Sequence, residues 1–282
     1  MRAYPALRLT FFEPASQEQL DHLLAQLDDF HPTAIHEIAD GIVAFFGSDG
    51  ARDAAAGHFG GFELLDVASE DVPDEDWAAR SQSSLTPVTA GRLTIAPPWA
   101  VTDDLRATAP GPVIVIQPSM GFGTGHHATT RLCLRFLQEI DLAGLVVLDI
   151  GTGSGVLAIC ARVLGGARVT GIDVDPDALA NARENLALNG LAGAIDLHEC
   201  DLSSSLRVPG APFDVMLANL TGALLQRDAA RFSALAAPTA TLIVSGFQSH
   251  EADEVTASLT AAGWTKTQAS EEERWMGLVF AR

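Results

Sequence analysis

The 282-residue chain has little positive charge for its size. Seventeen Lys and Arg residues stand against 36 Asp and Glu residues, so the formal net charge is −19. Because this charge repels phosphate backbones, we expect no direct binding of nucleic acid. A basic partner would be attracted, although an acidic surface can also serve solubility alone.

Long apolar runs are absent as well. No stretch approaches the ~20 consecutive apolar residues that span a bilayer. The first residues, MRAYPALRLTFF, lack the basic start, long apolar core and small-residue cleavage site of a signal peptide. We therefore expect a soluble, cytoplasmic protein without membrane contact. For the oligomeric state, which the sequence does not determine, we expect a monomer.

Cysteine is scarce, with Cys133, Cys160 and Cys200 the three in the chain. Their number is odd, they lie far apart in the sequence, and two of them fall in apolar helical patterns. This distribution predicts reduced thiols and neither a disulfide framework nor a zinc site.

Apolar sequence is abundant enough for more than one core, since 48% of the residues are hydrophobic. Residues 1–67 alternate between strand and helix patterns and predict a small α+β domain. Residues 68–100 are rich in Pro, Ser and acidic residues, which predicts a linker with a short helix near Trp77. Residues 101–282 then form a larger domain.

In the small domain, the strongest single signal is Asp40-Gly41, a dipeptide typical of hairpin turns. The other expected elements are a strand at 7–12, a helix after Ser16, a helix at 52–58 and a strand at 62–67.

Strand and helix patterns also alternate in the larger domain, which predicts a doubly wound parallel sheet. The last two strands flank the charged turn SEEER and should be antiparallel. The seven expected strands lie near 146–150, 168–173, 194–199, 213–219, 240–245, 264–269 and 275–281.

The first strand of this sheet runs into a glycine loop and a helix. Gly151, Gly153 and Gly155 permit backbone conformations that a Cβ forbids, so a ligand can approach closely. The spacing is G-x-G-x-G, and Val156 occupies the third-glycine position of the dinucleotide fingerprint G-x-G-x-x-G. A glycine loop alone is weak evidence of a ligand, because many α/β proteins turn tightly between strand and helix.

Asp173 strengthens that interpretation, because it ends the next strand 20 residues after Gly153. An acidic side chain at this place can accept hydrogen bonds from both hydroxyls of a ribose. Asp173 could instead cap the helix that begins near Pro176, but Asp175 is better placed for capping. The segment therefore predicts a nucleoside pocket.

A second glycine-rich loop, GFGTGHHATT, precedes a helix. Thr129 and Thr130 could cap that helix or offer a hydroxyl to a ligand. His126 and His127 are adjacent and therefore diverge, with no Cys or carboxylate at ligand spacing, so we expect no metal. One of these histidines could contact substrate or brace the loop.

Asn219 ends the fourth strand, at the edge of the sheet where open α/β folds bind ligands. Its amide could accept a hydrogen bond from an amine or position a cofactor, and a turn-forming Asn is the simpler alternative. The Asn/Asp-Pro-Pro-aromatic motif of methyltransferases that act on glutamine amides or adenine amines is absent, because Leu220, Thr221 and Gly222 follow.

Together these segments resemble the bacterial ribosomal protein L11 methyltransferase family, a group of class I S-adenosylmethionine-dependent methyltransferases. The matching motifs are GTGHHATT at 123–130, LDIGTGSG at 148–155, GIDVDP at 171–176 and ANL at 218–220. The G-T-G-x-H-x-T-T element is the specific part, since the G-x-G-x-G loop alone indicates only the superfamily. The family also has a small ferredoxin-like N-terminal module and a flexible connector.

The resemblance assigns Thr130, Gly151, Asp173 and Asn219 to S-adenosylmethionine binding. It implies a Rossmann-like catalytic sheet, and an N-terminal module that holds a ribosomal protein of the large subunit while its amino groups are methylated. A methyltransferase of the same fold that acts on RNA or a small metabolite is the alternative, and charge disfavours RNA. The sequence offers no obvious general base, so no catalytic residue is assigned.

Overall fold

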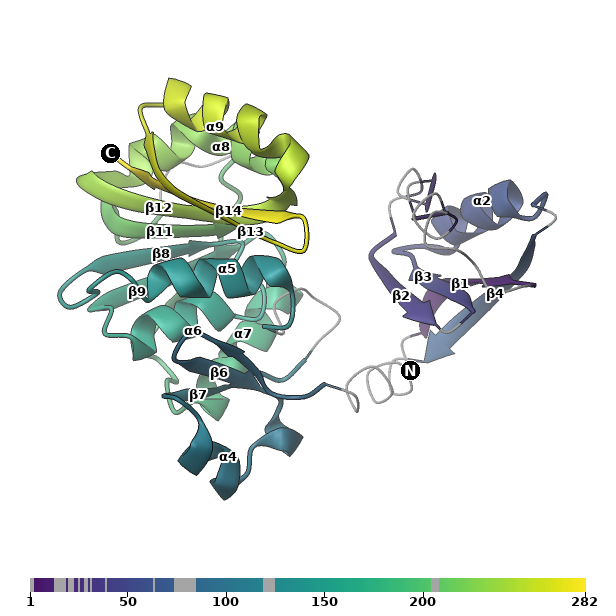
Figure 1. Cartoon of the computed structure of the whole chain (residues 1–282), viewed down its shortest axis with the longest axis horizontal. Helices are drawn as coiled ribbons and strands as arrows, with labels where there is room; N and C mark the ends of the chain where they lie inside the picture. The colour runs from purple at the N-terminus through teal and green to yellow at the C-terminus, as the bar shows by residue number, and fades with distance from the viewer. Residues whose placement is uncertain are drawn as a thin grey trace. The chain divides into compact units, whose positions relative to one another are not determined.

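The computed structural model describes residues 3–12, 19, 23–24, 26–27, 30, 32–38, 40–62, 64–73, 85–118, 125–203 and 208–282. The chain divides into two compact units, Met1–Ser84 and Leu85–Arg282 (Figure 1). Among these described residues, no helix is both long and apolar enough to cross a membrane.

The first unit is built on a four-stranded antiparallel sheet with the order β2-β3-β1-β4. Its elements are β1 (Ala3–Phe11), β2 (Ala34–Ile38), β3 (Gly41–Phe45), α2 (Asp49–Phe59) and β4 (Leu65–Pro73). Ile38 pairs with Gly41, so the predicted hairpin is confirmed, with Asp40 in the turn and Gly41 as the first residue of β3. The helix expected after Ser16 lies largely outside the described residues.

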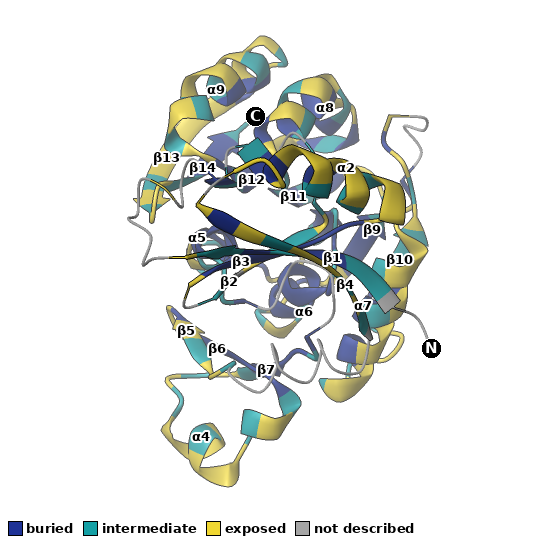
Figure 2. Cartoon of the chain, turned by 90° about the vertical axis from the view of Figure 1, so that its right-hand side faces the viewer, coloured by how far each residue is buried: buried dark blue, intermediate teal, exposed yellow. Residues whose placement is uncertain are grey.

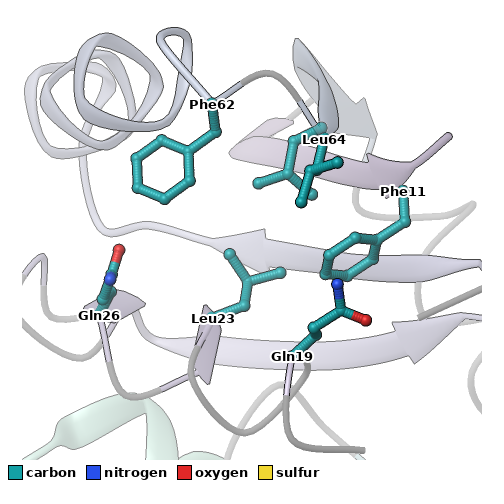
Figure 3. Close-up of a pocket in the computed structure, with 7 residues that line it drawn as sticks. Phe11, Gln19, Leu23, Gln26, Phe62 and Leu64 are labelled. Atoms are coloured by element: carbon teal, nitrogen blue, oxygen red, sulfur yellow. The ribbon is translucent and has the colours of Figure 1, made fainter. Parts of the chain in front are cut away.

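A pocket of about 110 Å³ opens beside β1 and β4 of the first unit. Figure 3 shows Phe11, Leu23 and Phe62 converging on it, with Gln19 and Gln26 at its margin. Leu64 and Leu65 complete the lining. Leu64 is 62% exposed, so an apolar side chain at the margin of the pocket is accessible to solvent.

The second unit contains a seven-stranded sheet with the order β10-β9-β8-β11-β12-β14-β13. Its strands are β8 (Val146–Ile150), β9 (Arg168–Asp173), β10 (Asp196–Glu199), β11 (Phe213–Asn219), β12 (Ala236–Gln248), β13 (Thr265–Glu272) and β14 (Trp275–Ala281). The first five are parallel, and β14 pairs antiparallel with β12 and β13. The predicted strands, including the antiparallel last pair, are therefore present.

Helices cover both faces of this sheet (Figure 1). One face carries α5 (Ala128–Leu137), α6 (Val156–Val163) and α7 (Pro176–Leu188), and the other carries α8 (Gly222–Leu235) and α9 (Ala252–Ala261). Along β8, Val147 joins the core under the first set of helices, whereas Leu148 joins the core under the second. The helices turn their exposed residues outward (Figure 2).

A small three-stranded sheet precedes α5. It consists of β5 (Val88–Ala90), β6 (Leu93–Ala96) and β7 (Val113–Val115), with η2 (Pro98–Ala100) and α4 (Asp103–Thr108) between the last two. Asn185 of α7 and Asn189, the residue that caps this helix, form hydrogen bonds with β7 and with the segment that follows it. Asn189 exchanges two hydrogen bonds with the Val115 backbone, and the Gln117 N–H donates to Asn185 Oδ1 at 2.7 Å.

The expected domain boundaries need correction. β4 continues to Pro73, so the first unit extends beyond residue 67. β5 and β6 lie within the expected 68–100 linker but belong to the second unit, because they pair with β7. The composition of this stretch concealed the end of β4 and the two short strands β5 and β6. The helix expected near Trp77 lies outside the described residues.

Candidate functional site

The strands that carry the predicted site residues are neighbours in the sheet. β8 lies between β9 and β11, and the chain passes from one side of β8 to the other after β10. Loops that leave β8 and β11 at their carboxyl ends therefore diverge, which is where open α/β sheets bind ligands. Gly151, Asp173 and Asn219 all lie at this edge.

The glycine loop after β8 adopts the conformation that its sequence predicts. Gly151, Gly153 and Gly155 have φ values of 67°, 52° and 80°, in the left-handed region that favours glycine. A Cβ on Gly151 would lie 2.6 Å from Leu220 Cδ2, in the loop after β11. A side chain at residue 151 would thus displace Leu220 and would be strained by the positive φ value.

Asp173 ties the glycine loop to the end of β9. Its Oδ2 accepts a hydrogen bond from the Gly153 N–H at 2.9 Å, and its Oδ1 accepts one from the Asp175 N–H at 3.0 Å. Asp175 caps α7 by accepting from the Asp177 N–H, as predicted. Asp173 is half-buried, and each carboxylate oxygen can accept a further hydrogen bond beyond these backbone donors.

Asp149 lies buried beneath the glycine loop. Its Oδ2 accepts hydrogen bonds from Thr152 Oγ1 at 2.7 Å and from the Ala158 N–H at 3.1 Å. Burial raises the pKa of Asp149 to about 7, the two hydrogen bonds oppose this shift, and the nearby Asp173 charge adds to it. Through these two hydrogen bonds, Asp149 connects the glycine loop to the first turn of α6.

The side chains of Thr130 and Asn219 are in contact at the carboxyl end of β11. The buried Thr130 hydroxyl lies 3.4 Å from Asn219 Nδ2, which donates to it. The capping role considered for the threonines falls to His127, whose Nδ1 accepts from the Thr129 N–H and lies 2.8 Å from Thr129 Oγ1. Thr130 can face Asn219 because its hydroxyl is not needed at the helix end.

The two histidines brace the segment before α5. His126 Nε2 lies 2.6 Å from the Thr86 carbonyl oxygen, so this nitrogen carries the proton and donates. The His127 ring meets the Trp275 indole edge-on, with ring centroids 4.6 Å apart. Burial and the Arg131 charge lower the pKa of His127. Within the described ranges, no group of three or more His, Cys, Asp or Glu residues could hold a metal ion.

The predicted site residues thus occupy one edge, although the structure connects them unequally. Thr130 contacts Asn219 directly, Asn219 is followed by the leucine that packs on Gly151, and Asp173 reaches the same loop through Gly153. Residues 119–124, which include most of the GFGTG motif, lie outside the described residues. Cys133 and Cys160 are buried free thiols whose pKa values are raised by burial, as their sequence context predicts.

The family model described as "Ribosomal protein L11 methyltransferase (PrmA)" matches residues 24–282 of this chain. The chain belongs to the ribosomal protein L11 methyltransferase family. The ribosomal protein L11 methyltransferase of Deinococcus radiodurans is 39% identical over 228 residues, which cover 78% of this chain and 82% of the relative. That of Thermus thermophilus is 37% identical over 213 residues, or 76% and 80% of the two chains.

A solved structure agrees with this membership. The ribosomal protein L11 methylase of Lactobacillus delbrueckii subsp. bulgaricus superposes with a TM-score of 0.64 and 27% sequence identity. The superposition covers 70% of this chain and 99% of that chain. The solved structure thus agrees in overall fold with most of this chain.

Sequence reasoning did not find every residue that builds this site. Asn185 is fully buried, and its Nδ2 donates to the Ser154 carbonyl at 2.9 Å, which joins α7 to the glycine loop. Glu272 and Trp275 reach α5 from the far end of the chain. Arg131 and Arg135 lie four residues apart on one helix face, where two like charges repel each other unless an acidic side chain lies nearby. This pattern could have indicated an acidic partner, but it does not identify which of the 36 Asp and Glu residues it is.

Proposed function

We propose that this chain transfers methyl groups from S-adenosylmethionine to amino groups of ribosomal protein L11. Family membership supports the reaction and its substrate. The observation that carries the proposal in this structure is the glycine cradle closed by Asp173, beside the contact between Thr130 and Asn219. One edge of the sheet thus offers a ribose acceptor and a pair of polar groups for an amino-acid moiety.

The residues present fit S-adenosylmethionine better than a dinucleotide. The loop from 151 to 155 contains no Lys or Arg and lacks the third glycine of the pyrophosphate fingerprint. Asp173 retains acceptor capacity for the two ribose hydroxyls. When bound, S-adenosylmethionine supplies a sulfonium methyl group to an attacking amine.

The role of Asn219 follows from its contact. Because Nδ2 donates to Thr130, the amide Oδ1 is the atom that can accept a hydrogen bond from the cofactor or from the incoming amine. We infer that Thr130 and Asn219 hold the methionine part, that Gly151 permits its close approach and that Asp173 binds the ribose. All four assignments belong to the proposal.

The nucleophile must be a neutral amine. A lysine side chain with a solution pKa near 10.4 loses its proton at pH 7 at a cost of about 4.6 kcal/mol. Desolvation of the ammonium in a closed site lowers that cost. Asp149 is buried beneath the loop and engaged by two donors, so we propose catalysis by positioning, with the proton leaving to water.

The order of the strands supports the finer structural proposal. A sheet ordered β10-β9-β8-β11-β12-β14-β13, with helices on both faces, supports the proposal of a doubly wound, Rossmann-like methyltransferase domain. The order β2-β3-β1-β4, with α2 between β3 and β4, fits a ferredoxin-like first unit. We propose that this unit holds the protein substrate.

The pocket in Figure 3 is the surface that we assign to this task. Its apolar lining suits an aliphatic or aromatic side chain, and exposed Leu64 extends it outward. The net charge of −19 favours a basic protein as the occupant and disfavours RNA. A cytoplasmic monomer that meets L11 before or during ribosome assembly is consistent with these features.

The decisive experiment mixes the protein with radiolabelled S-adenosylmethionine and either total ribosomal protein, ribosomal RNA or a small-metabolite extract. Label in one small basic protein that co-migrates with L11 supports the proposal. Label in RNA or in metabolites overturns it and favours the alternative substrates. Mass spectrometry of the labelled protein then identifies the methylated amines and the number of methyl groups.

A further inference from the structure

The hairpin between β13 and β14 contacts the start of α5, although the two segments lie far apart in the sequence. Its turn residues, Glu273 and Arg274, both have positive φ values, 52° and 68°. The Ser249 N–H and hydroxyl both donate to the Arg274 carbonyl oxygen, at 2.9 and 3.0 Å. The tip of the hairpin is thereby held in a defined conformation.

An ion-pair cluster joins the hairpin to the helix. Arg131 Nε donates to Glu272 Oε1 at 2.6 Å, and Arg135 Nη1 lies 2.7 Å from Glu272 Oε2. The Arg131 and Glu272 side chains are 12% and 20% exposed. A charged pair so shielded from water interacts more strongly than a surface pair.

Two further contacts complete this connection. Arg131 also donates to the His126 carbonyl oxygen, just before the helix. The His127 imidazole, which caps the helix, packs edge-on against the Trp275 indole. We use the term C-terminal brace for Glu272 and Trp275 together with Arg131 and His127.

The brace surrounds a residue of the proposed site. Thr130 lies between His127 and Arg131 on the first turn of α5, and its hydroxyl accepts the Asn219 amide. We propose that Glu272 and Trp275 are positioning residues for methyl transfer, because they hold the first turn of α5 where Thr130 meets Asn219. This inference rests on the proposed function, since it assumes that Thr130 and Asn219 bind S-adenosylmethionine.

A simpler role would be to anchor the hairpin. An anchoring residue would affect stability alone, whereas a positioning residue would act through Thr130. The test is therefore a double-mutant cycle that combines Glu272→Gln with Thr130→Val, measured by calorimetric titration of S-adenosylmethionine. The matched control is Glu271→Gln, which removes the same charge from an exposed neighbour on the same strand.

We expect Glu272→Gln to raise the Kd for S-adenosylmethionine by about three- to tenfold, within the range of coupling between neighbouring residues. In the Thr130→Val background it should add little, and Glu271→Gln should match the wild type in both backgrounds. Trp275→Leu should resemble Glu272→Gln, whereas Trp275→Phe, which keeps an aromatic ring against His127, should restore most of the affinity.

Thermal melting of each variant monitors folding separately from binding. Unchanged affinity in Glu272→Gln and Trp275→Leu, or effects that add fully to that of Thr130→Val, would overturn the positioning role. Should Glu272→Gln fail to fold, the comparison of Trp275→Leu with Trp275→Phe decides the question. Failure of the wild-type protein to bind S-adenosylmethionine would instead overturn the proposed function itself.

Discussion

Two walls of the proposed cofactor site are built in different ways. The first wall consists of the loops after β8 and β9, where Asp173 and Asp149 accept hydrogen bonds from loop backbone and hydroxyl groups. The second wall consists of the start of α5 and the end of β11, where Thr130 and Asn219 meet through their side chains. The first wall comes from one continuous β-α-β unit, and the second joins residues 89 positions apart.

This difference separates local from long-range specification. Glycines at three alternate positions and an aspartate at the next strand end define the first wall within thirty residues of sequence. The second wall depends on packing by the C-terminal brace, whose ion pair spans 141 positions. Substitutions in the first wall should therefore abolish cofactor binding, whereas those in the second should misplace a cofactor that still binds.

The largest effect is expected for Asp173→Ala. Removal of the carboxylate deprives the ribose of its acceptor and the Gly153 N–H of its partner, so we expect the Kd for S-adenosylmethionine to rise by about 100-fold or more. Calorimetric titration measures this change. Glu184→Ala, which removes an exposed carboxylate from α7, should retain wild-type affinity; an unchanged Kd in Asp173→Ala would refute the ribose assignment.

A smaller effect is expected in the second wall. Thr130→Val removes the hydroxyl that accepts the Asn219 amide, and we expect kcat/KM for L11 methylation to fall by roughly tenfold, the cost of one misplaced polar contact. Thr130→Ser retains the hydroxyl and should keep most of the activity. Equal activity of the Val and Ser variants would show that the hydroxyl has no part in catalysis.

Asp149 allows a test of the first wall through pH. Its folded-state pKa of about 7 exceeds its ordinary value of 3.8, so the folded protein binds an extra proton between these values. Stability should therefore fall as pH rises from about 4 to 7, with a slope of at most about 1.4 kcal/mol per pH unit from this group. Urea unfolding should show a steeper loss of stability with rising pH in the wild type than in Asp149→Asn.

Other groups that titrate in this range require a control. The lowered pKa of His127 acts in the opposite direction to that of Asp149, since burial favours the neutral imidazole and therefore makes the folded protein more stable at higher pH. Asp196→Asn, which alters an exposed aspartate, should retain the wild-type slope. Parallel pH profiles for the wild type and Asp149→Asn would contradict the buried-carboxylate interpretation.

The smallest effect is expected outside both walls, in the pocket of the first unit. Leu64→Asp places a charge beside the apolar lining, and we expect KM for L11 to rise by about fivefold while the Kd for S-adenosylmethionine stays constant. Steady-state methylation assays and titration separate the two quantities. Phe12→Asp, at an exposed position that does not line the pocket, serves as the control; equal KM values for both variants would argue against this docking surface.

The division between local and long-range features also explains which parts of the structure could be predicted from the sequence. β8, β9 and β11 were predicted at their observed bounds because buried parallel strands are apolar runs that end at glycine, aspartate or asparagine. The domain boundary was misplaced because β4 contains Asp66, Glu70 and Asp71 and does not read as a buried strand. Asn185 escaped notice because nothing local distinguishes a buried structural asparagine from an exposed helical one.

The span between Arg131 and Glu272 also has a consequence for how the protein matures. Ribosomes release the chain from its N-terminus, and elements pair only after both have left the ribosome. The glycine loop and Asp173 can adopt their places soon after β9 emerges, but the first turn of α5 must wait for β13 and β14. Correct placement of the cofactor should therefore be among the last properties that a nascent chain acquires.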